Sequence, residues 1–167
     1  MIAPGLDVLF CGINPSLMSA ERGHHFARPG NRFWPALHGS GFTPRLLSPD
    51  EDRTLPEYGL GITNLVDRPT RAADELGAEE LKAGAGALAS LAARYEPAVI
   101  AVVGLSVWRI VHGRPAAGPG LQPETVGGRP AWVLPNPSGL NAHYQLPDLI
   151  RLFADMREWV LDRSPDP

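Results

Sequence analysis

Two amide side chains stand in similar settings near opposite ends of the chain. Asn14 follows the apolar residues 10–13 in a Gly-Ile-Asn-Pro-Ser turn, and Asn136 follows residues 132–134 in an Asn-Pro-Ser-Gly turn. A polar group directly after an apolar strand lies at the carboxyl end of that strand, where open α/β sheets bind their ligands. We therefore expect the two amides to face each other across one cleft.

The chemistry available to these groups is the positioning of water. The side-chain carbonyl of Asn14 can orient a water molecule, but an amide is not a strong general base, so a reaction there would depend on geometry. Asp67 is the only carboxylate in residues 59–70 and follows a strand-like run, which makes it a second catalytic candidate. Alternatively, Asp67 pairs with Arg68 or Arg71 or caps a turn, and a structural role of this kind is favoured over the catalytic one.

Composition limits the class of protein. With 167 residues, 44% of them hydrophobic, we expect one domain over residues 1–167 and a frayed tail at residues 164–167. Cys11 is the only cysteine, which excludes an intrachain disulfide and a four-cysteine metal site. The sequence shows no leader and no apolar run close to the roughly 20 residues that span a bilayer, so we expect a cytoplasmic protein without a membrane partner.

The formal net charge of −3 means that any contact with nucleic acid must come from a local patch. Residues 22–45 supply one, because they contain seven Arg or His residues, no carboxylate and several aromatic rings. The seven are Arg22, His24, His25, Arg28, Arg32, His38 and Arg45. We expect this stretch, with Arg28 in it, to contact a polyanion. Phe33 and Trp34 are expected in the core, whereas Phe26 suits a base-stacking role as well as a core role.

The hydrophobic pattern predicts strands at residues 7–12, 61–66, 98–104 and 130–134, separated by helical or loop segments. One or two helices are expected over residues 73–95, and an amphipathic helix begins beside Pro147. Residues 44–56 and 114–130 are rich in Pro, Gly and charge and are interpreted as surface loops. Strands that alternate with helices indicate an α/β protein whose parallel sheet is covered on both faces.

Four motifs in the same order carry a family resemblance. They are Gly-Ile-Asn-Pro-Ser at 12–16, His-Phe-Ala-Arg-Pro-Gly-Asn-Arg-Phe-Trp at 25–34, Gly-Ile-Thr-Asn-Leu-Val-Asp-Arg-Pro-Thr at 61–70 and Asn-Pro-Ser-Gly-Leu at 136–140. Together they resemble the mismatch-specific uracil-DNA glycosylases, bacterial relatives of thymine-DNA glycosylase. The resemblance implies a three-layer α/β/α domain with a central, mainly parallel sheet of four or five strands. It also implies excision of uracil, thymine or related lesions opposite guanine in duplex DNA.

The same resemblance implies roles for individual residues. Asn14 would orient the attacking water, and Leu140 would be the wedge that replaces the flipped base. The base would contact Ile13, Phe26, Asn64 and Asn136, and the DNA would contact Ser19, Ser138, Gly139, Leu140 and Asn141. Ala142 stands where some relatives have arginine, and Asn64 where some bacterial relatives have lysine. The preferred base and the strictness of the mismatch preference therefore stay open.

Other classes of activity are less well supported by the sequence. Lys82 is the only lysine and is far in sequence from both Asn-Pro turns, so we expect a monofunctional enzyme without a Schiff base. His24 and His25 lack a third ligand at regular spacing, and we expect neither a metal nor an organic cofactor. The expected partner is double-stranded DNA with G:U or G:T mismatches, bound by a monomer. Two alternatives are a module that binds lesions without cutting and a nucleoside hydrolase on the same fold.

Overall fold

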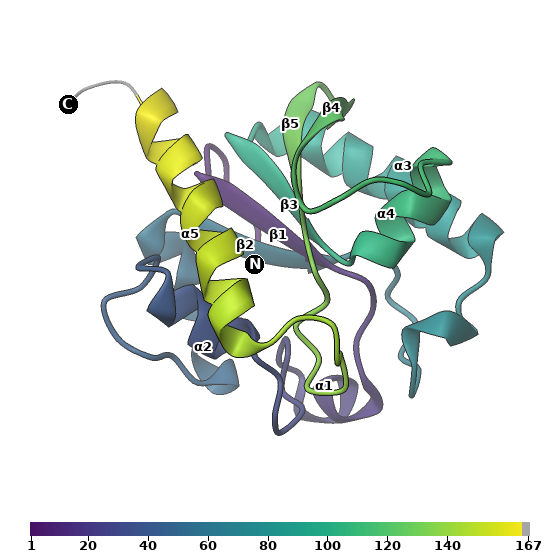
Figure 1. The fold of residues 1–167 in the computed structure, drawn as a ribbon, viewed down its shortest axis with the longest axis horizontal. Coiled ribbons are helices and arrows are strands. Elements are labelled where there is room, and N and C mark those ends of the chain that lie inside the picture. Colours follow the sequence, from purple (N-terminus) through teal and green to yellow (C-terminus); the bar gives the residue numbers. More distant parts are fainter. Residues whose placement is uncertain (165–167) are drawn as a thin grey trace.

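The computed structural model describes residues 1–164, and its centre is a five-stranded sheet (Figure 1). The strands are β1 (Val8–Gly12), β2 (Leu60–Asn64), β3 (Val99–Val103), β4 (Gly120–Val126) and β5 (Arg129–Leu134). They lie in the order β2-β1-β3-β5-β4. β1 pairs in parallel with β2 and β3, β3 pairs in parallel with β5, and β4 is antiparallel to β5. The predicted α/β class with a mainly parallel sheet is confirmed.

Helices cover both faces of the sheet, as Figure 1 shows. One face packs against α3 (Ala78–Tyr95) and α4 (Leu105–His112), and the other against α2 (Phe33–Gly39), α5 (Leu146–Arg163) and the 3₁₀ segment η1 (Pro49–Tyr58). Because side chains alternate along a strand, β1 sends Leu9 and Cys11 to the first face and Val8 and Phe10 to the second. The fully buried, apolar β1 is typical of a parallel strand covered on both sides.

The strands and long helices lie within a few residues of their predicted positions, but both predicted loops contain regular structure. Residues 114–130 include β4, which alternates between exposed and half-buried residues and carries a proline. Residues 44–56 include most of η1, where Asp52 and Leu55 are buried. In both cases the local composition is that of a loop. Pairing with β5 makes residues 120–126 a strand, and packing of Leu55 in the core accompanies the 3₁₀ segment. Residues 165–167 of the predicted tail lie outside the described residues.

The order of the strands places a crevice at the carboxyl ends of the strands. The connection from β1 to β2 carries α1 (Leu17–Arg22), α2 and η1, and the connection from β2 to β3 carries the 3₁₀ turn η2 (Ala73–Glu75) and α3 on the opposite face. The chain therefore leaves adjacent strands in opposite directions, which opens a crevice at their carboxyl ends. In Figure 1 the loop after β5 runs down beside α1, at the carboxyl ends of the strands.

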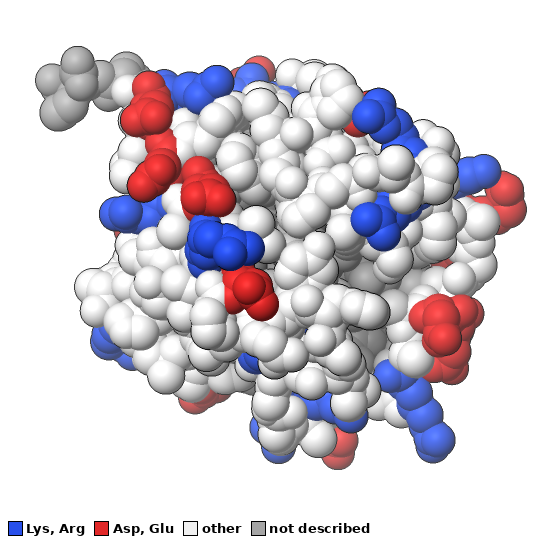
Figure 2. All heavy atoms as spheres, viewed as in Figure 1, with Lys and Arg blue, Asp and Glu red and all other residues white. Residues whose placement is uncertain are grey.

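Charged side chains of both signs are scattered over the face shown in Figure 2, with both signs interleaved along α5. The view shows no broad field of one sign, in keeping with the net charge of −3. Among the helices that the structure describes, none combines the length and the apolar composition needed to cross a membrane.

Candidate active site

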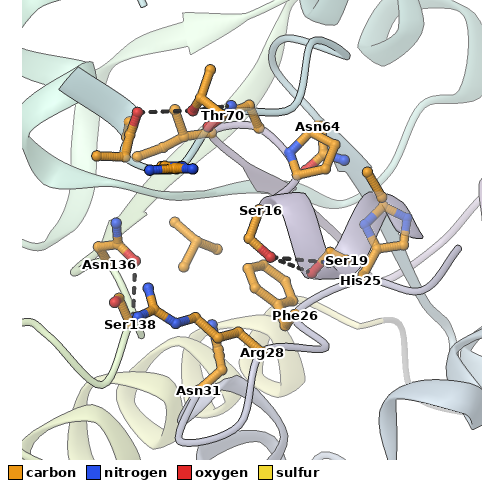
Figure 3. Close-up of a pocket in the computed structure, with 18 of the residues that line it drawn as sticks. Ser16, Ser19, His25, Phe26, Arg28, Asn31, Asn64, Thr70, Asn136 and Ser138 are labelled. Atoms are coloured by element: carbon orange, nitrogen blue, oxygen red, sulfur yellow. Dashed lines mark hydrogen bonds between the residues drawn. The ribbon is translucent and has the colours of Figure 1, made fainter. Parts of the chain in front are cut away.

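An open cavity of about 400 Å³ lies at the carboxyl ends of the strands (Figure 3). Segments that follow β1, β2 and β5 line it together with the loop between α1 and α2. Nine of the twelve predicted site residues line this cavity: Ile13, Asn14, Ser19, Phe26, Arg28, Asn64, Asn136, Ser138 and Leu140. Asp67, Gly139 and Asn141 are not among its lining residues. The two amides of the Asn-Pro turns thus border one cavity, as their positions after strands predicted.

Asn14 is held in one orientation by the segment that follows β2. That segment continues alongside the one after β1, because Val66 N–H donates to Ile13 O at 2.9 Å and Thr70 N–H donates to Pro15 O at 3.2 Å. The Asn14 Nδ2 group donates to Arg68 O and to Thr70 Oγ1, both at 2.8 Å. With both amide hydrogens engaged, the side-chain oxygen of Asn14 is the atom left to accept a hydrogen bond from water.

Thr70 is a site residue that the sequence analysis did not single out. Its hydroxyl is buried and donates to Ala72 O at 2.8 Å, so it can only accept from Asn14. This fixes which way the Asn14 amide is turned. The signal in the sequence was weak, because a threonine in a Pro-Thr turn is unremarkable until its distance from Asn14 is known.

Asp67 is exposed on the outside of the same segment. Its neighbour Arg68 forms a two-pronged ion pair with Glu80, with Nε and Nη2 donating at 3.0 and 2.9 Å. Within residues 1–164, no hydrogen bond or ion pair holds the Asp67 carboxylate to Arg68 or Arg71. The suggested pairing of Asp67 with either arginine is therefore wrong. A catalytic role for Asp67 stays a prediction.

Phe26, Gly12 and Asn64 meet at one wall of the cavity. Phe26 has a left-handed backbone (φ 52°), and its ring stacks on Phe33 with centroids 4.2 Å apart. A Cβ atom on Gly12 would lie 3.0 Å from Asn64 Oδ1 and 3.2 Å from Phe26 Cζ, so this position leaves little room for a side chain. No hydrogen bond to the rest of the described chain occupies the Asn64 amide, which keeps its donors and acceptor for a ligand.

The buried carboxylate of Asp52 fixes the position of His24 and His25, the two residues before Phe26. Asp52 accepts a hydrogen bond from His25 N–H at 3.0 Å, and its other oxygen lies 3.3 Å from His24 Nδ1. Trp34 Nε1 donates to His25 O at 3.2 Å, which anchors the same residue from the other side. Burial lowers the pKa of His25, and the neighbouring terminal amine and His24 add to the effect while Asp52 opposes it. His25 therefore presents a neutral ring to the cavity at neutral pH, although it belongs to the basic stretch that was expected to contact a polyanion.

The loop of residues 136–144 forms the opposite wall. Asn136 Oδ1 accepts from Ser138 N–H, and Asn141 Nδ2 donates to Asn136 O, both at 3.0 Å. The Asn136 Nδ2 group is left as a donor at the cavity (Figure 3). Leu140 is 74% exposed at the edge of this wall, and no other large apolar side chain in residues 1–164 is as exposed. The Asn141 side chain is engaged inside the loop, and its contact with DNA stays a prediction.

The cationic groups available at the cavity are fewer than the sequence predicted. Four of the seven basic side chains in residues 22–45 make contacts within the protein: His24, Arg32, His38 and Arg45. Arg28 and Arg71 line the cavity, and neither pairs with another described residue. Ser19 is buried, and its hydroxyl accepts from Ala27 N–H and Ser16 Oγ–H at 3.0 Å. Ser19 therefore fixes the backbone at Ala27, next to Phe26. Its contact with a phosphate stays a prediction.

Groups that could support other chemistry lie elsewhere. Lys82 is exposed on α3 near Glu79, outside the cavity. Burial raises the pKa of the Cys11 thiol to about 12, so Cys11 is not an available nucleophile. Over residues 1–164, no three His, Cys, Asp or Glu side chains gather where they could hold one metal ion.

A family model described as the uracil DNA glycosylase superfamily matches residues 1–160. The match spans nearly the whole chain and includes both Asn-Pro turns, the Phe26 loop and the segment that carries Thr70. It agrees with the mainly parallel α/β sheet and with a cavity at the carboxyl ends of its strands. The chain therefore belongs to the uracil-DNA glycosylase superfamily, a membership that indicates a DNA glycosylase of base excision repair.

Proposed function

We propose that the protein is a monofunctional, mismatch-specific DNA glycosylase that removes uracil opposite guanine from duplex DNA and leaves an abasic site. It acts as a monomer and needs no metal or organic cofactor. Thymine, ethenocytosine and deaminated purines are further candidate substrates. The observation that carries the proposal is the Asn14 amide, whose two hydrogens are held by Arg68 O and Thr70 Oγ1 while its oxygen stays available for water.

The target atom is inaccessible inside a stacked duplex, so the nucleotide must first be flipped into the cavity. Leu140 is the exposed apolar side chain at the rim and would fill the gap that the base leaves. Phe26 offers a ring that is already backed by Phe33, which suits stacking on the flipped base. The unoccupied amide of Asn64 can pair with the donors and acceptors at the edge of a pyrimidine.

In the chemical step, the bond between the anomeric carbon and the base nitrogen breaks and the base takes both electrons. Water, oriented by the Asn14 oxygen, adds to the anomeric carbon and releases its proton to solvent. Asn136 Nδ2 can donate a hydrogen bond to the negative charge that develops on the base. Because Asn14 is no base, the rate depends on how well the water is placed.

The position of Lys82 outside the cavity supports hydrolysis over Schiff-base chemistry. An exposed leucine beside an open cavity favours a duplex substrate over a free nucleoside. These two features make the monofunctional DNA glycosylase the best-supported function for this site.

The test is single-turnover base release from a labelled duplex with a central G·U pair, followed by alkali to reveal abasic sites. We expect release by the wild type, and a loss of at least about 100-fold in Asn14→Ala with lesion binding retained. Asp67→Ala is compared with Asp155→Ala, an exposed aspartate on α5. A loss specific to Asp67→Ala would assign Asp67 a catalytic role. An A·U duplex beside the G·U duplex measures the preference for the mismatch.

Other outcomes point to the alternatives. Tight binding of the G·U duplex without base release by the wild type would indicate a lesion-binding module. Release from free deoxyuridine at a comparable rate would indicate a nucleoside hydrolase. If the wild type neither binds the G·U duplex nor releases its uracil, the proposal is wrong for this substrate.

A further inference from the structure

We propose that Arg32 is a positioning residue. It holds the 136–144 loop, before DNA binds, in the conformation in which Leu140 can enter the duplex. This inference rests on the proposed function, because it assigns Leu140 the role of wedge. Arg32 lies at the start of α2, more than 100 residues from the loop in sequence. Arg32 belongs to the basic stretch that was expected to contact a polyanion, but its side chain points inward to the loop.

The Arg32 guanidinium donates hydrogen bonds to four carbonyl groups of one short loop. Nε donates to Pro137 O at 3.4 Å, Nη1 to Tyr144 O, and Nη2 to Ser138 O and to Asn141 O, the last at 3.1 Å. The Arg32 backbone N–H adds a further bond to Pro137 O at 2.9 Å. Within residues 1–164, no carboxylate pairs with Arg32, so its charge is directed entirely at this loop.

The chemistry of the side chain explains why an arginine suits this position. A guanidinium has five N–H donors in a planar fork and can reach acceptors that lie in different directions. Hydrogen bonds from a charged donor are about twice as strong as neutral ones. A lysine at residue 32 would keep the charge but not the fork. It would therefore leave some of the loop carbonyls to water.

A second contact clamps the same loop. A Cβ atom on Gly139 would lie 2.8 Å from the carbonyl oxygen of Gly30, so the two backbones are in close contact there. The residue between Gly30 and Arg32 is fixed as well, because Asn31 Oδ1 accepts from Phe33 N–H at 2.9 Å and Phe33 is fully buried. The loop that carries Leu140 is thus tied to the beginning of a helix that is rooted in the core.

The consequence is preorganisation. Ordering a loop when DNA binds would reduce affinity, whereas a loop ordered on folding meets the duplex in its final shape. Bonds inside the loop occupy the backbone N–H groups of Ser138, Leu140, Asn141 and His143. Hydrogen exchange at these amides therefore reports whether Arg32 keeps the loop in shape.

The experiment compares the wild type with Arg32→Lys, and uses Arg45→Lys as the matched control because Arg45 pairs with Glu51 away from the cavity. In the free protein, we expect the amides of Ser138, Leu140, Asn141 and His143 to exchange at least about 10-fold faster in Arg32→Lys, with β1 and α5 unchanged. Arg45→Lys should leave both regions as in the wild type. If Arg32→Lys does not fold, Arg32→Gln replaces it with a neutral side chain of similar length.

The second readout uses a G·U duplex with a fluorescent base beside the uracil. Arg32→Lys and Leu140→Ala should each reduce base flipping and single-turnover release by about 10-fold or more, and the double variant should lose no more than Leu140→Ala alone. Unchanged exchange in the loop, faster exchange throughout the protein, or fully additive losses would overturn the role of Arg32. Absence of base release by the wild type would instead overturn the proposed function, and the exchange result would stand separately.

Discussion

The catalytic potential of this site depends on the orientation of one amide. Asn14 has a donor end and an acceptor end, and only the acceptor end can receive a hydrogen bond from an attacking water. Two protein acceptors, Arg68 O and Thr70 Oγ1, hold the donor end. The Thr70 hydroxyl can accept because its own hydrogen goes to Ala72 O. A chain of three hydrogen bonds thus determines which atom of Asn14 faces the substrate.

Replacing Thr70 with valine tests this chain. Valine has nearly the same shape but no hydroxyl, so one Asn14 hydrogen loses its partner and the amide is free to turn. We expect Thr70→Val to slow single-turnover base release about 10- to 100-fold while lesion binding changes little. Thr70→Ser keeps the hydroxyl and should stay close to the wild-type rate. Equal rates for the valine and serine variants would show that the hydroxyl does not position Asn14.

At the scale of elements, loops and strand ends position the site residues. The β4–β5 hairpin turn lies at the opposite end of the strands and packs against α3. The turn between β4 and β5 consists of Gly127 and Gly128, both with positive φ, as two-residue hairpin turns require. Gly127 also lies against the backbone of α3, where an added Cβ would be 2.1 Å from Ala89 O and 2.9 Å from Ala93 N. This contact fixes the distance between the antiparallel edge of the sheet and its longest covering helix on that face.

The two glycines allow a matched comparison of stability. Gly128→Ala introduces only backbone strain, because a Cβ there meets open space, and should lower the free energy of unfolding by about 1 kcal/mol. Gly127→Ala adds a clash with α3 and should lower it by about 3 kcal/mol or more. Urea denaturation measures both values. Similar losses for the two variants would mean that α3 moves away at little cost.

At the scale of the whole molecule, electrostatics give little general attraction to DNA. The net charge is −3, and charges of both signs are scattered over the face in Figure 2. Four of the seven basic groups in residues 22–45 make contacts within the protein. The arginines that line the cavity are Arg28 from this stretch and Arg71 from the segment after β2. DNA binding should therefore involve few phosphate contacts.

This predicts a shallow dependence of DNA affinity on salt. With two or three phosphates neutralised, a plot of log Kd against the logarithm of salt concentration should have a slope of about 2 to 3. Arg28→Ala should reduce that slope by about 1 and leave base release at saturating protein unchanged. Arg94→Ala, at the end of α3 away from the cavity, should change neither quantity. A steep slope, or the same effect from both variants, would contradict the assignment of Arg28 to a phosphate.

Much of the architecture was predictable because it follows from local pattern. Strands buried on both faces read as apolar runs, and amphipathic helices repeat their apolar residues at helical spacing, so β1, β3 and α5 were predicted close to their observed bounds. β4 was missed because a half-exposed edge strand with a proline has no such pattern. Its pairing with β5 decides its conformation.

For the candidate site, the sequence by itself determined the residue types and the strand ends that carry them: Asn14 after β1, Asn64 at the end of β2 and Asn136 after β5. Only the tertiary structure decided what these residues touch. It placed Thr70 against Asn14, left Asp67 outside the cavity, and turned Arg32 from the basic stretch onto the 136–144 loop. These contacts join residues 56 to 112 positions apart, so they depend on strand register and loop packing rather than on local sequence. A side chain's chemistry is encoded locally, but its partner is set by the fold.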